Sequence, residues 1–346
     1  MRGVVFLGER ELELREFPDP VPGPGEVVIE MKASGMCGSD LHAYRAQRSG
    51  GGMGAALGLG GSGGPVIAGH EPCGVIVARG PGVSATQAPE GARVMNHHYW
   101  GCGSCKHCRL GWSQLCGKGI VVFGVTGDGG HARYLKAPAP TMVPLPDPLS
   151  FEEGAAISCG TGTAYGALHR MGLTGEHTIA IFGQGPVGLS ATLLANAMGA
   201  RVIALDVGAE RRALASEFGA ETVIDPRATD PVLALKELTH GEGVDLALDC
   251  SASPEARAAA VRSVRTWGTA CFVGEGGEVN LNVSQDLLRR QVTLIGSWTF
   301  SSVGQMECAR FIAERRIPLK RLITHRFSLE QAAEAYRLFD TQTTGK

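Results

Sequence analysis

The chain has 346 residues, which is long for a single hydrophobic core and predicts two domains. Its 32 Lys and Arg residues nearly balance its 34 Asp and Glu residues, which argues against a nucleic-acid or membrane-surface partner. Charged residues follow the first methionine too closely for a signal peptide, and no apolar run approaches the about 18 residues of a membrane span. We therefore expect a cytoplasmic protein that acts on small molecules.

The N-terminal part of the chain predicts a β-rich domain with one low-complexity segment. Short apolar runs at 4–7 and 27–31 flank a stretch rich in proline and glycine at 18–25, a pattern typical of strands joined by turns. Residues 49–64 consist mostly of glycine. Such a composition packs poorly, so this segment is interpreted either as a bare flexible insertion or as a lid near a site.

From about residue 178, short apolar runs alternate with segments long enough to form helices. The runs predict strands at 178–182, 202–206, 222–224, 244–250 and 269–274. The longer segments predict helices at 186–198, 210–218, 232–238 and 254–265. This alternation predicts an α/β fold, a doubly wound parallel sheet with helices on both faces. Amphipathic helices are expected around 303–314 and 329–339, so the α/β segment is interpreted as an insertion into the β-rich domain.

The first strand of this segment runs directly into a Gly-x-Gly-x-x-Gly motif that opens the next helix. Gly183 would permit the tight turn, Gly185 would let the backbone approach a pyrophosphate, and Gly188 would let the helix pack closely on the strand. The free N–H groups at the helix N-terminus would bind the phosphates. We expect dinucleotide contacts from Gly183, Gly185, Pro186, Val187 and Gly188.

An acidic residue at the end of the next strand strengthens this assignment. Asp206 would accept hydrogen bonds from the ribose hydroxyls and repel a 2′-phosphate, which favours NAD over NADP. Arg211 and Arg212 follow closely and weaken this preference, and Arg211 is expected to contact the cofactor.

Four of the ten cysteines, Cys102, Cys105, Cys108 and Cys116, lie in one short stretch. Pairs separated by two residues are typical of a tetrahedral zinc site, and four thiolates leave no open position for a substrate. A bacterial ferredoxin-type site would have a different last spacing, followed by proline. We therefore expect a structural zinc, with an iron–sulfur site and oxidised or empty thiols as the alternatives.

Two further stretches carry donor residues, Cys37-Gly38-Ser39-Asp40-Leu41-His42 and Gly69-His70-Glu71. By themselves, this cysteine and histidine would most simply be a buried pair. The pattern Gly-His-Glu-x2-Gly-x5-Gly at 69–80, however, resembles the signature of the zinc-containing medium-chain alcohol dehydrogenases. The four-cysteine loop and the glycine motif follow in that family's order, so the resemblance covers nearly the whole chain.

The resemblance implies a Rossmann domain inserted into a GroES-like catalytic domain. The boundaries expected are 157–296 for the Rossmann domain, and 1–156 together with 297–346 for the catalytic domain. It also implies a homo-oligomer, with a tetramer favoured and a dimer possible. Relatives usually continue into one more strand beyond the position that corresponds to Lys346.

The resemblance also implies the roles of individual residues around a catalytic zinc. Cys37, His70 and Cys159 correspond to the three protein ligands, which leave the fourth position open. Glu71 corresponds to a carboxylate that can act as an alternate ligand, and Asp40 to the acceptor that orients the His70 ring. The cofactors implied are therefore NAD and two zinc ions per chain, one catalytic and one structural.

In this family the catalytic zinc polarises the alcohol oxygen, and hydride then passes to the nicotinamide. Ser39 is implied to take the alcohol proton and to pass it, through the ribose hydroxyl, to His42 and solvent. An idle, exposed His42 is the alternative. Thr163 is implied to contact the nicotinamide ring.

The substrate is less well defined by the sequence. Residues 96–100, Asn-His-His-Tyr-Trp, correspond to the segment that lines the family's pocket, and a wall rich in histidine suits a polar alcohol or polyol. The alternatives are that these side chains face away, or that the substrate is L-threonine or a simple secondary alcohol. A non-catalytic protein that binds zinc and a nucleotide is the alternative from a different class. The remaining cysteines, Cys73, Cys250, Cys271 and Cys308, are expected in the core.

Overall fold

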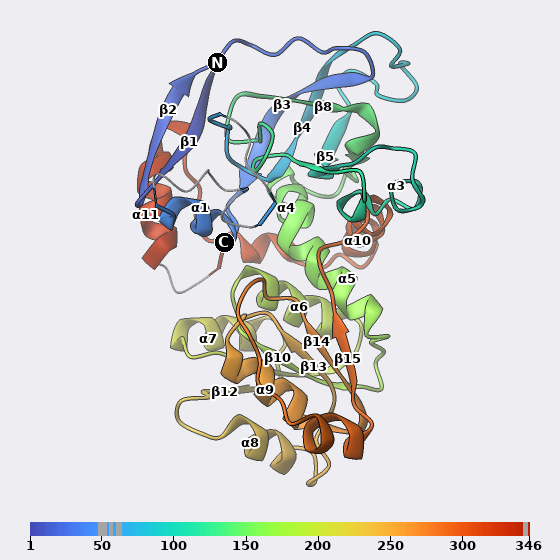
Figure 1. The fold of residues 1–346 in the computed structure, drawn as a ribbon, viewed down its shortest axis with the longest axis vertical. Coiled ribbons are helices and arrows are strands. Elements are labelled where there is room, and N and C mark those ends of the chain that lie inside the picture. The colour runs from blue at the N-terminus through green and yellow to red at the C-terminus, as the bar shows by residue number, and fades with distance from the viewer. Residues whose placement is uncertain (48–53, 55–57, 60–63, 342–344) are drawn as a thin grey trace.

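The structure, a computed structural model, describes residues 1–47, 54, 58–59, 64–341 and 345–346. Most of the glycine-rich segment 49–64 therefore lies outside the described residues, as do residues 342–344. Figure 1 shows two parts placed end to end along the long axis, with α4 and α5 running between them. No helix within these described ranges has the length and apolar character needed to cross a membrane.

The upper part in Figure 1 is built on an antiparallel sheet of five strands in the order β8-β3-β4-β5-β9. These strands are β3 (Glu26–Gly35), β4 (Glu71–Arg79), β5 (Arg93–Asn96), β8 (Tyr134–Pro138) and β9 (Met142–Pro144). Two small antiparallel pairs join them: β1 (Arg2–Gly8) with β2 (Glu11–Glu16), and β6 (Tyr99–Trp100) with β7 (Val121–Val122). Consecutive residues Val27, Val28 and Ile29 of β3 are all buried, so both faces of this strand are covered at this point.

Helices and short turns surround this sheet. They are α1 (Asp40–Arg45), α3 (Lys106–Arg109), α4 (Phe151–Ala156), α5 (Gly162–Arg170), α10 (Ser302–Glu314) and α11 (Ala332–Thr341). Ser150 begins α4 with a capping box, in which its hydroxyl accepts a bond from the Glu153 N–H and its own N–H donates to the Glu153 carboxylate. A single π-helical turn, η3 (Ile157–Thr161), continues α4 into α5. Such turns are frequent at functional sites, and this one carries Cys159.

The lower part holds a parallel sheet of six strands in the order β12-β11-β10-β13-β14-β15. The strands are β10 (Thr178–Phe182), β11 (Arg201–Leu205), β12 (Thr222–Ile224), β13 (Val244–Asp249), β14 (Val264–Phe272) and β15 (Thr293–Gly296). Its helices are α6 (Pro186–Ala197), α7 (Ala209–Glu217), α8 (Pro231–Glu237) and α9 (Pro254–Ser263). The strand order reverses between β10 and β13, which is where doubly wound sheets bind ligands.

The predicted α/β fold inserted into a β-rich domain is confirmed, with some boundaries corrected. The helix expected at 254–265 ends at Ser263, because Val264 already has extended backbone angles and begins β14. The strand expected at 269–274 is therefore longer at its start, and it turns at Trp267, whose φ is 65°. The helix expected at 329–339 begins as a 3-10 turn, η7 (Leu329–Gln331), before α11.

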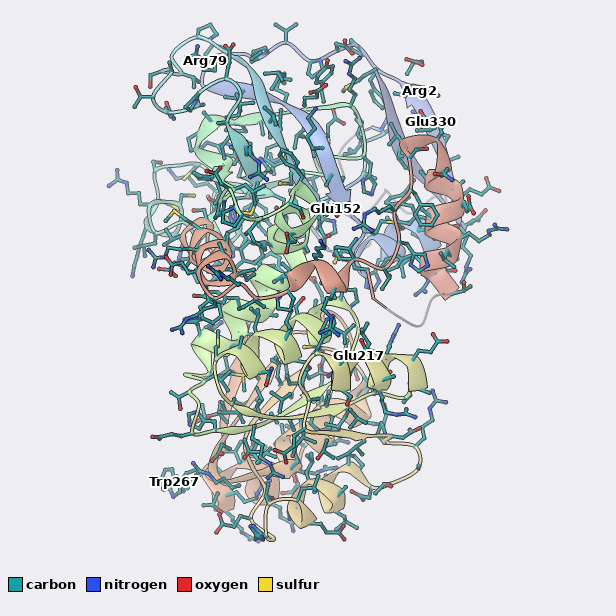
Figure 2. The ribbon with its side chains drawn as sticks, turned by 180° about the vertical axis from the view of Figure 1, so that it is seen from behind. Arg2, Arg79, Glu152, Glu217, Trp267 and Glu330 are labelled. Carbon is teal, nitrogen blue, oxygen red and sulfur yellow. The ribbon has the colours of Figure 1, made fainter. Side chains whose placement is uncertain are left out.

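The C-terminal segment returns to the upper part and forms ion pairs with distant elements. Glu330 lies beside Arg2 of β1 in Figure 2, and the two side chains are 2.5 Å apart. Arg326 pairs with Glu152 of α4, and Arg321 with Glu217 of α7. Exposed ion pairs of this kind each contribute little to the free energy of unfolding. They do show which elements the C-terminal segment contacts.

Candidate active site

Four donor side chains that are remote in sequence converge near the junction of the two parts. Cys37 follows β3, His70 and Glu71 lie at the start of β4, and Cys159 lies in η3. Their ligand atoms are all within 4.8 Å of one another. The two thiol sulfurs are 3.9 Å apart, close to the about 3.8 Å that bonds of about 2.3 Å to a tetrahedral zinc would impose. The donor set therefore fits a zinc ion.

The protonation of the two thiols also suits a cation. A hydrogen bond with Cys159 lowers the pKa of Cys37 well below its usual value, in spite of the burial that opposes this change. The same hydrogen bond, together with burial, raises the pKa of Cys159. One thiolate and one thiol thus share a proton, and a bound cation would displace it because metal ligation requires deprotonated sulfur.

The His70 ring is held in a defined orientation. Its Nδ1 lies 2.9 Å from Asp40 Oδ1, and both residues are buried. The carboxylate can only accept, so Nδ1 carries a proton. Burial lowers the pKa of His70, but the Asp40 charge and hydrogen bond, together with Cys37, raise it well above its usual value, so a metal ion would have to displace the Nε2 proton. The Ser39 hydroxyl, at the start of α1, is 3.2 Å from Nε2. Asp40 thus occupies the position that the resemblance implied for it.

Glu71 has a partner that the sequence did not reveal. The Lys346 ammonium lies 2.6 Å from one carboxylate oxygen of Glu71, and both groups are buried. Burial raises the pKa of Glu71 to about 8, although the Lys346 charge opposes the change. The lysine also donates to the Met36 carbonyl. Glu71 is therefore tied to the C-terminal segment as well as being close to the thiols.

A cavity of about 430 Å³ opens beside these donors and is lined by residues from both parts. Of the predicted residues, it is lined by Cys37, Ser39, His42, His70, Cys159, Thr163, Gly185, Pro186, Val187 and Arg211. His42 is exposed, and its N–H donates to the Ser39 carbonyl within the first turn of α1. The structure thus brings the proposed metal ligands, the proposed proton relay and the glycine turn to one cavity.

The expectation for the histidine-rich segment 96–100 is only partly met. His98 and Tyr99 line the cavity, and burial lowers the pKa of His98 well below its usual value, so that its ring is neutral. His97 instead lies with its Nδ1 3.2 Å from the Gln305 side chain in the core. Asn96 donates to Thr141, and Trp100 does not line the cavity, so His98 and Tyr99 are the residues of this segment that contribute to the wall. His97 and His98 form the connection between β5 and β6, and this connection turns one ring into the core and the other into the cavity.

The glycine motif has the geometry its spacing predicts. Gly183 has a φ of +86°, and a Cβ there would lie 2.8 Å from the Ser251 side chain. A Cβ on Gly188 would collide with the Gly183 carbonyl oxygen, so this glycine lets α6 pack on β10. A Cβ on Gly185 would meet nothing within 4 Å, so the space beside it is free for a ligand.

A second cavity, of about 1250 Å³, continues from this turn along the ends of β10 and β11. Asp206 and Arg211 both line it. Asp206 is buried, and its two oxygens accept hydrogen bonds from the N–H groups of Gln184 and Gly208, at 2.6 and 2.7 Å. These bonds hold the carboxylate rigidly at the cavity wall. The Arg211 guanidinium lies 3.8 Å away from it.

The four-cysteine loop forms a second donor cluster, separate from the cavity. The sulfurs of Cys102, Cys105, Cys108 and Cys116 lie within 4.8 Å of one another. Backbone N–H groups already point at two of them, because the Cys105 N–H donates to Cys102 and the Cys102 N–H donates to Cys116. Gln114 of the same loop donates to Thr299 and to the Phe300 carbonyl, which joins the loop to the segment beside the first cavity.

Three of the four remaining cysteines, Cys73, Cys271 and Cys308, are buried in the core as predicted. The prediction that Cys250 lies in the core is wrong, because this residue is only partly buried and lines both cavities. It directly follows β13, and the carboxyl ends of parallel strands face the ligand crevice.

Sequence reasoning missed Glu275 and Trp298, which line the first cavity, and Lys346, which pairs with Glu71. Glu275 lies just beyond the carboxyl end of β14, so the rule that placed Asp206 could also have found it. No local pattern marks Trp298 or Lys346, since each reaches the site only through the folding of the whole chain.

Comparison with known proteins agrees with this site. The family model described as an alcohol dehydrogenase GroES-like domain matches residues 23–147, and the one described as a zinc-binding dehydrogenase matches residues 186–314. The zinc-type alcohol dehydrogenase-like protein YphC of Escherichia coli (strain K12) is 42% identical, over 100% of this chain and 97% of its own length. A sorbitol dehydrogenase of Bacillus subtilis (strain 168) is 32% identical, over 97% of this chain and 92% of its own length.

Among solved structures, the alcohol dehydrogenase TADH from Thermus sp. ATN1 matches with a TM-score of 0.87 and 27% identity, over 99% of this chain and 97% of that chain. The similarity thus extends over essentially the full length in each comparison. The chain therefore belongs to the zinc-containing, medium-chain alcohol dehydrogenase family.

Proposed function

We propose that this NAD-dependent zinc dehydrogenase oxidises a polar secondary alcohol or polyol. The observation that carries the proposal is the convergence of the Cys37, His70 and Cys159 donors on a cavity that also reaches the glycine turn at 183–188. A metal ligand set and a dinucleotide turn at one cavity allow an alcohol carbon and a nicotinamide ring to meet there.

In this proposal Cys37, His70 and Cys159 hold the catalytic zinc, with Glu71 as the alternate ligand, and the four-cysteine loop holds the structural zinc. When bound, the catalytic zinc supplies a Lewis acid that makes the alcohol oxygen more acidic. The Ser39 hydroxyl, close to the His70 ring, accepts the alcohol proton. His42, exposed at the cavity edge, passes the proton to solvent after the ribose hydroxyl has relayed it.

The cofactor contacts follow from the second cavity. The phosphates lie against the start of α6 at Gly183–Gly188, and Asp206 accepts from the ribose hydroxyls. A carboxylate held at this wall repels a 2′-phosphate, so NAD is preferred over NADP. Arg211 lies between the two cavities and contacts the cofactor, and Thr163 contacts the nicotinamide ring.

The substrate preference rests on the polar lining of the first cavity. His98, Tyr99, Thr299 and Glu275 contribute polar groups to it, and the ring of Trp298 packs against Tyr99. Several hydroxyls of a polyol can bond to such a wall. Among the described residues that line the cavity, Arg211 at the cofactor end is the sole Lys or Arg, so the carboxylate of L-threonine would have no partner beside Glu275. A polyol is therefore favoured over the amino acid and over a simple secondary alcohol.

The decisive measurement is the absorbance of NADH during incubation of the zinc-loaded protein with polyols, simple secondary alcohols and L-threonine. We expect turnover with NAD and polyols. A protein that binds NAD and zinc but oxidises none of these compounds would be a non-catalytic binding protein, and the proposal would be wrong.

A matched pair of variants tests the ligand assignment. Cys159→Ala is expected to lower the zinc content from two to one per chain and to abolish activity without unfolding the protein. Cys308→Ala, which changes a buried cysteine of α10 away from both cavities, serves as the control and keeps both zinc ions. Equal zinc content in the two variants would contradict the assignment.

We further propose the domain boundaries 157–296 and 1–156 with 297–346, a cytoplasmic location and a homo-oligomer, most simply a tetramer. The ten cysteines are all free thiols, which suits a reducing compartment. The outer strand β15 and the neighbouring turns expose Leu288 and Leu294, a surface on which a second copy can pair. Light scattering coupled to size exclusion distinguishes tetramer, dimer and monomer.

A further inference from the structure

Asp249, the last residue of β13, is a buried carboxylate to which the proposed reaction gives no role. It is 0% exposed, and one of its oxygens accepts hydrogen bonds from the N–H and the hydroxyl of Ser251, at 2.9 and 2.6 Å. The other oxygen accepts from the Ala252 N–H at 3.3 Å. All three donors belong to the loop that follows β13, so the carboxylate fixes the backbone of this loop.

Arg257 of α9 supplies the opposite charge that a buried carboxylate needs. Its Nε donates to Asp249 at 3.2 Å, and its side chain is 8% exposed. One terminal nitrogen of the same guanidinium donates to the Gly274 carbonyl at 2.5 Å. The guanidinium also lies over the ring of Phe272, 5.5 Å from its centroid, at the end of β14. One planar side chain thus joins the loop after β13 to the loop after β14.

The two loops approach each other closely at this edge of the sheet. The Asp249 carbonyl accepts hydrogen bonds from the N–H groups of Val273 and Gly274, at 2.9 and 3.1 Å. A Cβ on Gly274 would collide with the Ala252 nitrogen, and a Cβ on Gly277 would collide with the Ala252 carbonyl oxygen. The backbones of the two loops are therefore in direct contact, and a shift of one loop requires a shift of the other.

Both loops line the first cavity, whereas the pair of Asp249 and Arg257 lines neither cavity. The lining residues from the two loops are Cys250, Ser251, Ala252, Val273, Gly274 and Glu275. The pair thus lies behind the loops and can affect a ligand only through their position. Glu275 directly follows Gly274, the residue whose carbonyl Arg257 holds.

Stability alone does not account for this pair. The cost of removing two charges from water offsets most of their attraction, so a buried ion pair adds little to the free energy of unfolding. What the pair does provide is one defined arrangement of two loops that both reach the cavity.

We propose that Arg257 is a positioning residue, which fixes Glu275 against the substrate through its bonds to Asp249 and to the Gly274 carbonyl. The inference rests on the proposed function, since it takes Glu275 as a contact of a polyol. When the bond to Gly274 is lost, the carboxylate of Glu275 is no longer held at one place on the cavity wall.

The test compares Arg257→Lys with Arg265→Lys. Lysine keeps a positive charge beside Asp249, but its single nitrogen cannot reproduce the fork with which arginine bonds to Asp249 and Gly274 together. Arg265 donates to Asp245 at 2.6 Å and joins the opposite, amino ends of β13 and β14, away from both cavities. The control therefore makes the same chemical change in the same two strands.

Hydrogen exchange of the full chain measures the loop without any turnover. In Arg257→Lys we expect the amides of residues 273–277 to exchange about 10-fold faster than in the wild type, because a charge-assisted hydrogen bond that opposes opening is lost. In Arg265→Lys they are expected to exchange at the wild-type rate. Equal exchange in Arg257→Lys and the wild type would overturn the inference and leave the proposed function intact.

Kinetics connect the loop to Glu275. We expect Arg257→Lys to lower kcat/KM for polyols (sorbitol, xylitol and ribitol) about 10-fold relative to 2-butanol, and to cause no further loss when combined with Glu275→Ala. A residue that only stabilises the fold would lower kcat/KM for all these alcohols equally, and its effect would add to that of Glu275→Ala; this result would overturn the inference. A wild-type chain that oxidises none of the alcohols would contradict the proposed function, and the role of Glu275 with it.

Discussion

Glu275 is the only acidic side chain among the described residues that line the first cavity, and it comes from the loop after β14. It is exposed, and its charge helps to raise the pKa of Tyr99 on the opposite wall, after the larger effect of burial. The carboxylate is thus available to accept hydrogen bonds from a substrate. It also makes the cavity unfavourable for an anion.

We expect Glu275→Ala to lower kcat/KM for polyols by about 10-fold, because a hydrogen bond to a charged group contributes roughly 1.5–3 kcal/mol. Steady-state kinetics with a polyol and with an aliphatic secondary alcohol check this. The aliphatic alcohol has no second hydroxyl that could bond to Glu275, so its kcat/KM should not change. Glu278→Ala, in the same exposed loop but away from the cavity, is the control. An equal loss for both substrates would contradict the role.

Asp206 is the residue proposed to select NAD over NADP. Asp206→Ala is expected to raise KM for NAD by about 10-fold and to improve the use of NADP, because the variant loses two ribose hydrogen bonds and the repulsion of a phosphate. Asp225→Ala is the control, because Asp225 follows the neighbouring strand β12 and pairs with Arg212 instead. Initial rates with both cofactors give the answer, and an unchanged NAD to NADP ratio would contradict the assignment.

Single residues show how far a sequence alone can be interpreted. Cys37, His70 and Cys159 were predicted because the family resemblance relates positions that lie far apart in the chain. Lys346 could not be predicted as a partner of Glu71, since the two residues lie 275 positions apart and no local pattern marks the contact. Hydrogen bonds between such distant groups become visible only after folding.

At the scale of elements, two glycines in the turn from β10 into α6 have different roles. Gly188 allows close packing of the helix on the strand, and Gly185 leaves space for a ligand. Gly188→Ala would place a methyl group against the Gly183 carbonyl, whereas Gly185→Ala would place one in open space. We expect Gly188→Ala to destabilise the protein by about 2 kcal/mol, as overpacking typically does. Gly185→Ala is expected to keep the wild-type unfolding temperature and to weaken NAD binding by about 10-fold, because its methyl occupies the space for the pyrophosphate.

Thermal unfolding and NAD titration of both variants give the measurement, and each variant is the control for the other. Similar stability of the two proteins would show that Gly188 does not contribute close packing. If Gly185→Ala binds NAD as tightly as the wild type, the pyrophosphate does not lie beside Gly185.

The elements themselves were predictable to different degrees. Five of the six strands and the four helices of the parallel sheet were predicted within a few residues, because these strands are continuous apolar runs and the helices have terminal signals such as Pro186 or Ser253. The edge strand β15 (Thr293–Gly296) was not predicted. The π-turn η3 had no such signal, because its backbone depends on packing between α4 and α5. The division of His97 and His98 between core and cavity likewise depends on the conformation of the connection between β5 and β6, which composition does not reveal.

At the scale of the whole molecule, buried histidines make stability depend on pH. Burial lowers the pKa of His97 and of His131 to about 4. In the unfolded chain these rings protonate near pH 6.5, so between about pH 6.5 and about pH 4 the unfolded state binds more protons. The free energy of unfolding therefore falls as the pH falls through this window, by up to about 1.4 kcal/mol per pH unit for each histidine.

Urea unfolding at several pH values between about 6.5 and about 4 tests this dependence. His97→Gln is expected to reduce the slope by the contribution of one histidine. His169→Gln, which changes an exposed ring, is expected to leave it unchanged. A slope that is the same in wild type and His97→Gln would show that His97 is protonated in the folded state.

The two parts of the molecule meet at the first cavity, and each supplies half of what the reaction needs. The upper part contributes the proposed metal donors and the proposed proton relay, and the lower part contributes the glycine turn and Glu275. Both parts must therefore be docked before an alcohol and a nicotinamide can lie next to each other.

The distance in sequence between Cys37 and Cys159 has a consequence for the order in which the protein matures on the ribosome. The four-cysteine loop is local in sequence, so it can capture its ion soon after it emerges. The other donor set is complete only when Cys159 has been made, 122 positions after Cys37. A nascent chain stalled before Cys159 should thus already hold one zinc tightly and exchange the other freely.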